Sequence, residues 1–299
     1  MDAIHNYLLK GCLIIALSVI HIPSFGGAWG GSHLEQESTS SSDSARVMDL
    51  FQKAKSLKQK TIGRYMVFFG RQLKGLPYVA KTLEVNKEER LVVNLRQLDC
   101  TTYVETVLAL SRCMAQGKPT FANYLTQLRL IRYAGGVVSY PTRKHYFTYW
   151  IQQSVKQGLV KDIQAPDPPF KAVQTVNADY MTNHLSQYPM LTGKPQWVSE
   201  IRSMEKSITG LRPCYIPTVA IDNGWLLRRT VHDGDIIAIV TTKQGLEISH
   251  VGIAVWHADG IHMLNASSLY HNVVEDSNLL RTYLKQQKSA KGIRVVRPE

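Results

Sequence analysis

The sequence predicts one α+β domain in which helices come first and strands come late. The chain has 299 residues, 44% of them hydrophobic and 19% charged, a composition that excludes a mostly disordered protein. Apolar residues recur at helical spacing from residue 45 to about residue 131. After residue 234 the pattern changes to short apolar runs separated by turn residues, which favours an antiparallel sheet. Because neither a repeat nor a linker interrupts residues 45–299, we predict a single domain there.

The residues before this domain have a different character. The apolar run 11–20 is followed by the small-residue stretch 26–31, an order typical of a secretory signal. The run is too short to span a membrane, which takes about 20 apolar residues. We therefore expect residues 1–30 to be a signal peptide that exports the chain, without stable membrane insertion. Residues 31–44 are rich in serine, and we expect a flexible spacer there.

The first half of the predicted domain is helical. Apolar spacing, together with the Gly and Pro residues that interrupt it, predicts helices at 45–57, 61–73, 101–114 and 124–131. Residues 137–217 are irregular and rich in proline and aromatic residues, with one predicted helix near 144–157. We treat residues 115–215 as an insertion in the domain.

The second half carries the predicted sheet. Short apolar runs predict strands at 235–240, 248–256, 261–266 and 292–296. A helix over about 277–287 is predicted before the last strand. Asp259 and Gly260 form a turn signal, so the second and third of these strands should make a hairpin.

The charge is strongly basic, with 35 Lys and Arg against 23 Asp and Glu, a net +12. These residues are spread along the chain without a basic run or a recognisable nucleic-acid module, so we expect no nucleic-acid partner. A solvated basic surface explains this charge, and attraction to an acidic cell-wall polymer is the alternative.

Three cysteines follow the predicted signal peptide, and an odd number in an exported chain leaves at least one free thiol. Cys100 and Cys113 lie on one predicted helix about 20 Å apart, too far to form a disulfide. Whether Cys113 pairs with Cys214 stays open.

Cys100 is the candidate nucleophile. Asp99 is a suitable N-cap, which places Cys100 in the first turn of the helix, where the helix dipole favours a thiolate and lowers the thiol pKa. Cys100 also shares a stripe with apolar residues of the helix, so its sulfur should face whatever the helix packs on.

His250 is the candidate base. Alternation along its strand places His250, Gly252 and Ala254 on one face, where the small residues leave room for another element, such as the start of a helix. If the hairpin loop has two or four residues, Asn265 shares the face of His250, whereas a three-residue loop would select His262 instead. A thiol, an imidazole and an orienting amide make the Cys-His-Asn arrangement of nucleophilic acyl transfer.

A catalytic zinc site is an alternative, because four histidines, 250, 257, 262 and 271, lie close in sequence. A turn position for His257, and opposite faces for His250 and His262, argue against the convergence that catalytic zinc needs. We therefore expect no metal and no cofactor.

Four segments around these residues resemble the NlpC-type cysteine peptidase superfamily. Residues 98–105 (LDCTTYVE) are similar to its nucleophile motif, and residues 248–255 (ISHVGIAV) and 264–268 (LNASS) to the motifs of its base and third residue. Residues 234–240 (GDIIAIV) look like the strand before them. The resemblance covers roughly residues 65–299, and it implies a papain-like core in which the nucleophile's helix packs on an antiparallel sheet.

Three further segments resemble the N-acetylmuramoyl-L-alanine amidase-like branch: residues 75–80 (GLPYVA), 82–84 (TLE) and 143–147 (RKHYF). This resemblance implies hydrolysis of the amide bond between N-acetylmuramic acid and L-alanine in anhydro-muropeptides. Two positions depart from the branch. Lys81 replaces a small residue, which puts substrate fit nearby in doubt, and Asn265 replaces a histidine that many relatives carry.

Six residues are the candidates for the site. Cys100 would be the nucleophile, His250 the base and Asn265 the residue that fixes the imidazole tautomer. Tyr78, Arg143 and His145 are the candidates for substrate binding. For Tyr78 the alternative is ordinary packing, and for Arg143 and His145 an ion pair on a loop.

Two other functions remain open at this point. One is cleavage between γ-D-glutamate and the diamino acid of the stem peptide, which the insertion 115–215 would decide by shaping the cleft. The other is an inactive wall-binding protein. In each case the expected partners are peptidoglycan fragments, the expected location is the periplasm or the cell exterior, and the expected state is a monomer.

Overall fold

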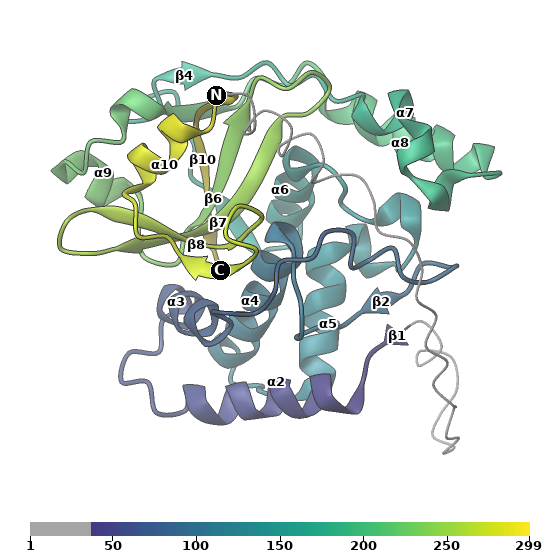
Figure 1. Cartoon of the computed structure of the whole chain (residues 1–299), viewed down its shortest axis with the longest axis horizontal. Coiled ribbons are helices and arrows are strands. Elements are labelled where there is room, and N and C mark those ends of the chain that lie inside the picture. Colours follow the sequence, from purple (N-terminus) through teal and green to yellow (C-terminus); the bar gives the residue numbers. More distant parts are fainter. Residues whose placement is uncertain (1–36) are drawn as a thin grey trace.

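The structure is a computed structural model that describes residues 37–299. The predicted signal peptide, 1–30, and the start of the serine-rich segment, 31–36, lie outside the described residues. The described chain forms an α+β domain in which a large antiparallel sheet lies between two sets of helices (Figure 1). Within these residues, no helix is long and apolar enough to cross a membrane.

The serine-rich segment is folded from residue 37 on, so the expected spacer is wrong there. Strand β1 (Glu37–Ser38) pairs in parallel with β2 (Leu91–Val92), and helix α2 (Ser41–Ala54) starts within the serine run. Ser40 caps this helix by accepting a hydrogen bond from the Asp43 amide. Asp43 is only 1% exposed and accepts a 2.9 Å hydrogen bond from the amide of Leu95. The serines are helix-start residues, which composition alone does not distinguish from a linker.

Helices α3, α4 and α5 confirm three predicted helices with small changes of their ends. They span Ile62–Gln72, Cys100–Ala115 and Phe121–Arg132. Thr61 and Thr120 cap α3 and α5 through hydroxyls that accept a backbone hydrogen bond, and Asp99 caps α4. With α2, they lie on one side of the sheet, at the bottom of Figure 1.

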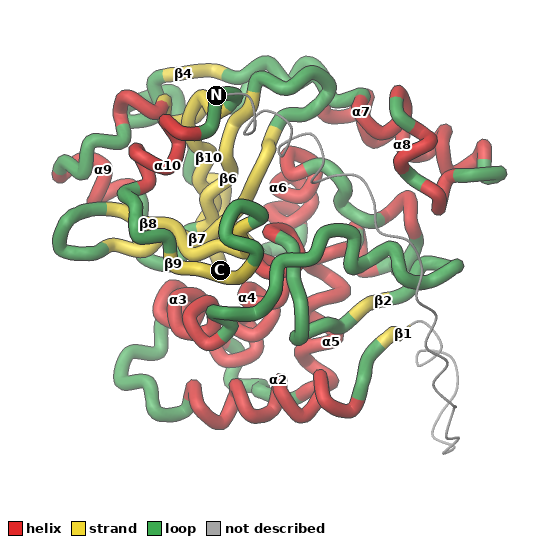
Figure 2. The backbone as a smooth tube through the Cα atoms, viewed as in Figure 1, coloured by secondary structure: helices red, strands yellow, loops and turns green. Residues whose placement is uncertain are grey.

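The main sheet has eight strands within the described chain, and all its pairings are antiparallel. Its order is β4-β5-β10-β6-β7-β8-β9, and β3 pairs with β10. The strands span Val160–Asp162 (β3), Ala172–Val173 (β4), Cys214–Pro217 (β5), Ile236–Thr241 (β6), Ile248–Trp256 (β7), Ile261–Ser267 (β8), Asn272–Glu275 (β9) and Ala290–Pro298 (β10). The four predicted strands are present as β6, β7, β8 and β10. Strand β9, which follows β8 in Figure 2, was missed because four residues are too few to show an alternation.

The two faces of the sheet belong to different cores. Val251, Ile253 and Val255 of β7 lie in the same buried cluster as α2, α3, α4 and α5. Ala254 lies in a second cluster with α9 (Trp225–Thr230) and α10 (Leu280–Gln286). The helix that carries Cys100 therefore packs against the large residues of β7. The face of Ala254, where we expected room for another element such as the start of a helix, packs with α9 and α10.

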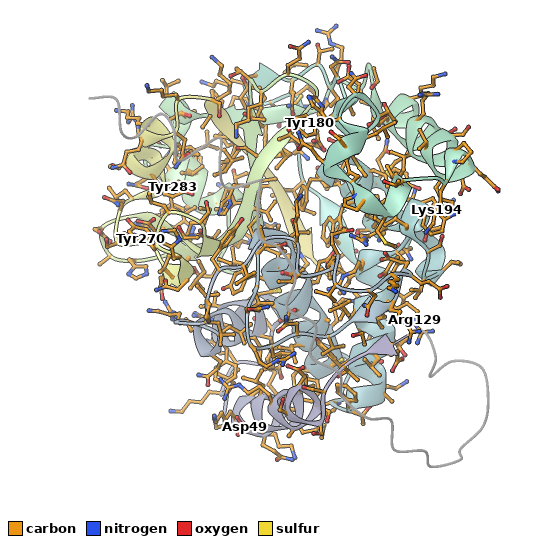
Figure 3. All side chains as sticks on the ribbon, turned by 45° about the vertical axis from the view of Figure 1, so that its right-hand side comes forward. Asp49, Arg129, Tyr180, Lys194, Tyr270 and Tyr283 are labelled. Carbon is orange, nitrogen blue, oxygen red and sulfur yellow. The ribbon has the colours of Figure 1, made fainter. Side chains whose placement is uncertain are left out.

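The insertion 115–215 is more regular than predicted. It contains α5, the expected helix as α6 (Phe147–Lys156), and also α7 (Tyr180–Asn183) and α8 (Pro195–Ile208). Ile201, Met204 and Ile208 of α8 are buried in a third cluster. Only these three apolar residues form the buried stripe of α8, and the helix begins at a proline. Such a short pattern does not predict a helix, so the sequence indicated irregular chain here. Figure 3 labels Tyr180 and Lys194 in this region, on the side away from Tyr283.

Candidate active site

Cys100 is the first residue of α4, and it lies in the first turn of the helix as the sequence predicted. Asp99 accepts a 2.8 Å hydrogen bond from the Thr102 amide, and its own amide donates to the Thr102 hydroxyl at 2.9 Å. This reciprocal pair is a capping box, which fixes where the helix begins. The Asp99 carboxylate is thereby engaged in capping, and the thiol next to it is held at the helix start.

The pKa of the Cys100 thiol is raised to about 12, mainly by burial and next by the negative charge of Asp99. Hydrogen bonds from the Val251 backbone and from Thr101 oppose this shift but do not outweigh it. The expected low thiol pKa is therefore wrong for this conformation, because desolvation exceeds the effect of the helix start. Cys100 rests as a thiol.

His250 and Asn265 are joined by a hydrogen bond. Trp256 pairs with Ile261, so the hairpin loop has four residues, 257–260, the case in which Asn265 was expected on the face of His250. Nε2 of His250 lies 2.9 Å from Oδ1 of Asn265, and Asn265 is fully buried. Because Oδ1 can only accept, Nε2 carries the proton and Nδ1 has the lone pair.

Burial lowers the pKa of His250, while the hydrogen bond to Asn265 and the charge of Asp99 raise it by less. The imidazole is therefore neutral at pH 7. A neutral imidazole with a fixed tautomer can accept a proton at Nδ1, as a general base must.

Cys100 and His250 share their neighbours, although they come from segments 150 residues apart. The sulfur accepts a hydrogen bond from the backbone of Val251, the residue that follows His250. The Asp99 charge raises the pKa of both groups. The structure thus brings the thiol, the imidazole and the Asn265 amide to the beginning of β7.

Tyr283 of α10 belongs to the same site and was missed in the sequence. Its ring centroid lies 6.5 Å from that of His250. Burial raises the pKa of its hydroxyl, and the charges of Asp276 and Cys100 add to the effect. Figure 3 shows Tyr283 on the same edge of the molecule as Tyr270. The only sequence signal was its place on the apolar stripe of α10, with Leu280 and Leu284, which predicts burial and nothing about a site.

Tyr78 lies beside the segment that leads to Cys100. It forms an isolated parallel bridge with Leu98, and its amide donates a 2.9 Å hydrogen bond to the carbonyl of His271. This places Tyr78 next to the start of α4 in the fold. Its part in substrate binding stays a prediction.

Arg143 and His145 are held by other contacts. Arg143 is buried and forms ion pairs with Glu84 and Glu89. Nε2 of His145 lies 2.7 Å from the carbonyl of Tyr140, and burial, then Arg143, lowers the pKa of this histidine to about 3. These partners connect the insertion to the loop after Tyr78. Among the described hydrogen bonds, none joins Arg143 or His145 to Cys100, His250 or Asn265.

Lys81, the departure noted in the same loop, has a left-handed backbone with φ of 61°. Its Nζ lies 3.4 Å from the carbonyl of Gln187 in the insertion. A residue expected to affect substrate fit thus also contacts the insertion.

The other cysteines and histidines lie outside this cluster. Cys113 and Cys214 are free thiols in the described chain, as is Cys100. His262 packs elsewhere: its Nδ1 lies 2.9 Å from the carbonyl of Asp276. One ring nitrogen of His257, one of His262 and one carboxylate oxygen of Asp259 lie within 4.8 Å of one another, a group that includes neither His250 nor His271.

Comparisons with known proteins identify a family that this chain matches. The family model of AmiA-like, N-acetylmuramoyl-L-alanine amidase-like proteins matches residues 68–293, a range that contains the whole Cys-His-Asn cluster. No curated protein matches the chain.

Solved structures give a similar result. An N-acetylmuramoyl-L-alanine amidase from Bacteroides uniformis is 33% identical, with a TM-score of 0.74, over 80% of this chain and 99% of that one. A Bacteroides fragilis protein, named provisionally as a xylanase, is 36% identical, with a TM-score of 0.71, over 76% of this chain and 98% of that one. A Legionella pneumophila protein, 22% identical over 86% of this chain and 94% of that one with a TM-score of 0.64, shares the fold.

Proposed function

Because the chain belongs to the AmiA-like family of N-acetylmuramoyl-L-alanine amidase-like proteins, we propose that it hydrolyses the amide bond between N-acetylmuramic acid and L-alanine in anhydro-muropeptides. The family and the Bacteroides uniformis neighbour support a cell-wall amidase. The observation that carries the proposal further is the hydrogen bond between His250 and Asn265 beside the thiol of Cys100. A thiol, an oriented imidazole and an amide are the parts that acyl transfer through a cysteine requires.

In the proposed first step, Sγ of Cys100 attacks the carbonyl carbon of the muramic lactyl group while its proton passes to Nδ1 of His250. The negative charge then lies on the former carbonyl oxygen, and the Cys100 backbone amide at the helix start is the donor proposed for it. When the intermediate collapses, the C–N bond breaks and His250 gives its proton to the amine of L-alanine. A thioester between Cys100 and the lactyl carbonyl remains.

In the second step, water hydrolyses the thioester. His250, neutral again, takes a proton from the water, whose oxygen attacks the same carbonyl carbon. Collapse breaks the C–S bond, and His250 returns its proton to the sulfur. The lactyl carboxylic acid is released and loses its own proton to solvent. Asn265 touches neither reacting atom and acts by holding the imidazole with Nδ1 as the accepting nitrogen, so we assign it a positioning role.

The resting charges fit this order of events. The raised pKa of Cys100 and the lowered pKa of His250 favour a neutral pair over a thiolate and an imidazolium. The thiolate would then form only as the proton moves during attack. A water-poor site makes the developing charges interact strongly with nearby dipoles.

We further propose that this helix and sheet form a papain-like core of the NlpC type. Two features support it: the nucleophile candidate begins a helix, and that helix packs on an antiparallel sheet whose strands carry the base and its partner. Export to the periplasm or cell exterior, a monomeric state, and muropeptides as the partners complete the proposal.

The test is product analysis by mass spectrometry on an anhydro-disaccharide tetrapeptide. We expect free disaccharide and intact tetrapeptide from the unaltered protein and from Cys214→Ala, which removes a part-buried thiol distant in sequence. Cys100→Ala should lower the rate by at least about 10³-fold.

Other outcomes would select another function. A disaccharide-dipeptide product would assign cleavage after γ-D-glutamate, and binding without turnover would assign a wall-binding protein. Cleavage that persists in Cys100→Ala would contradict cysteine catalysis. Xylan is a useful negative substrate, because glycoside hydrolysis generally uses a pair of carboxylates, whereas this site is built on a thiol and an imidazole.

A further inference from the structure

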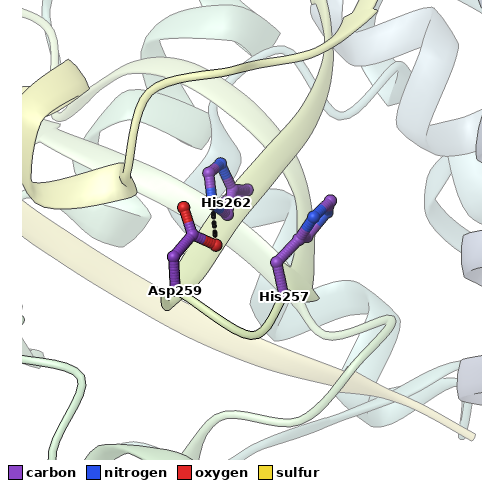
Figure 4. A group of neighbouring side chains, drawn as sticks. All are labelled: His257, Asp259 and His262. Atoms are coloured by element: carbon purple, nitrogen blue, oxygen red, sulfur yellow. Dashed lines mark hydrogen bonds and ion pairs between the residues drawn. The ribbon is translucent and has the colours of Figure 1, made fainter.

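We propose that His257, Asp259 and His262 form a binding site for a divalent transition metal ion of the zinc type, separate from the proposed active site (Figure 4). His257 and Asp259 lie in the loop of the β7–β8 hairpin, and His262 is the second residue of β8. His250 is seven residues before His257 on the extended strand, about 23 Å away. The metal would therefore hold the hairpin tip and take no part in the amidase reaction.

The three possible donor atoms lie close together in the structure. One ring nitrogen of each histidine and one oxygen of Asp259 lie within 4.8 Å of one another. Nε2 of His262 is 3.1 Å from Oδ1 of Asp259. In a tetrahedral zinc site with bonds of 2.0–2.2 Å, ligand atoms are about 3.3 Å apart. The His262–Asp259 pair is close to this spacing, and a ring nitrogen of His257 lies within 4.8 Å of both donor atoms.

The tautomer of His262 suits a metal ligand. Its Nδ1 lies 2.9 Å from the backbone carbonyl of Asp276, which can only accept, so Nδ1 carries a proton. In the neutral ring, Nε2 then has the lone pair and points at the Asp259 carboxylate. A lone pair facing a carboxylate oxygen at 3.1 Å is unfavourable unless a cation or a second ring proton lies between them. A ring nitrogen held by a carbonyl is also what orients most metal-binding histidines.

His257 is oriented in the same way from another side. Its Nε2 lies 2.7 Å from Oε1 of Glu275. Arg71 donates two hydrogen bonds to Glu275, at 3.0 and 2.7 Å. A carboxylate held by an arginine in this way can only accept, so it takes the Nε2 proton of His257 in a hydrogen bond. Nδ1 is then the nitrogen of His257 that has a lone pair.

The donor chemistry selects the class of ion. Two imidazoles and one carboxylate suit Zn²⁺ and its neighbours, whereas Ca²⁺ and Mg²⁺ prefer sets of oxygen ligands. His262 is buried, but the Asp259 side chain is 64% exposed and that of His257 is 39% exposed, so an ion can enter and a water can be the fourth ligand. The ion would connect the hairpin tip to β8, and, through Asp276 and Glu275, to the end of β9.

The test uses the full chain carrying Cys100→Ala, so that the active-site thiol cannot bind metal. After treatment with a chelator, the protein is titrated with ZnCl₂ by calorimetry and its melting temperature is measured. We expect about one equivalent of Zn²⁺ to bind, with a rise in Tm of several degrees when the free ion is at about 100 Kd. CoCl₂ should produce visible d–d absorption without the charge-transfer band of a thiolate ligand.

Substitutions at the two exposed ligands should leave the fold intact, so a loss of binding in these variants reports on the metal site itself. His257→Gln and Asp259→Asn should each weaken Zn²⁺ binding by at least about 10-fold, judged from the loss that even indirect metal contacts cause. His232→Gln, an exposed histidine before β6, is the matched control and should bind as before. Absence of saturable binding, or equal binding by all these variants, would overturn the proposal. In that case, the contact between Nε2 of His262 and Asp259 holds the hairpin tip without a metal ion.

Discussion

Nε2 of His250 donates a 2.9 Å hydrogen bond to Oδ1 of Asn265, a residue on the adjacent strand. The four-residue loop 257–260 sets the register that places both side chains on one face of the sheet. This contact fixes the tautomer of the imidazole and directs its Nδ1 lone pair away from Asn265. It is thus the feature from which the behaviour of the proposed base can be predicted.

Replacing Asn265 should slow the reaction more than it weakens substrate binding. We expect Asn265→Ala to lower kcat by about 10- to 100-fold with little change in KM, because the base loses its orientation but the substrate loses no contact. Since the hydrogen bond raises the pKa of His250, its removal should also shift the acid limb of the rate profile to lower pH. Asn123→Ala, at the start of α5, is the control. An unchanged kcat would remove Asn265 from the mechanism.

The pH dependence of kcat/KM should have a wide plateau. Burial holds the pKa of His250 below its ordinary 6.5, so the rate should rise with pH through a value under 6.5, as the imidazole loses its proton. The pKa of Cys100 is raised from 9.0 to about 12, so the rate should not fall again by pH 9. Rates measured from pH 4 to pH 10 check both limbs. A rise centred above 6.5 would show that a charged pair is the active form.

Arg143 should matter for stability more than for substrate binding. Removing it leaves Glu84 and the buried Glu89 without their partner, and breaking a buried ion pair costs about 3–5 kcal/mol. Arg143→Ala should therefore lower the free energy of unfolding by about this amount in urea titrations. Arg202→Ala, at an exposed position on α8, should change it by less than about 0.5 kcal/mol. If Arg143→Ala leaves the free energy of unfolding unchanged and raises KM, Arg143 is a substrate contact.

Gly234 should not tolerate a side chain. It precedes β6 with φ of +88°, and an added Cβ would lie 2.6 Å from the Cα of Gly63 in α3. Gly210 has nearly the same φ, +87°, but an added Cβ there meets nothing within 4 Å. Gly210→Ala should thus report backbone strain alone, about 1 kcal/mol, and Gly234→Ala strain plus a clash of backbones, about 3 kcal/mol or more. Equal midpoints in urea for the two variants would mean that the two segments separate easily.

Local signals were enough to predict the parts of the candidate site that lie on single elements. Asp99 as the N-cap predicted that Cys100 lies in the first turn of α4, and alternation predicted β7 around His250. The hairpin arithmetic also named Asn265 for a four-residue loop, since strand period and loop length together determine which side chains share a face.

Features that depend on tertiary packing could not be predicted from local sequence patterns. Composition suggested a spacer where Asp43 is buried against Leu95. The small residues of β7 beside His250 suggested room for another element, but not that α4 packs on the opposite face, against Val251, Ile253 and Val255. The thiol pKa was expected to be low because the helix start is visible in the sequence, whereas the burial that raises it is not.

By itself, the sequence determined the order of the main helices and strands, the position of Cys100 in the first turn of α4, and two candidate partners for His250, namely Asn265 and His262, because these follow from neighbours in the chain. Only the tertiary structure decided that Tyr283 lies beside His250, that Arg143 pairs with Glu84 and Glu89, and that Cys100 rests protonated. Each of these depends on which distant segments exclude water from a group. Burial of that kind is a property of the packed chain and has no local pattern in the sequence.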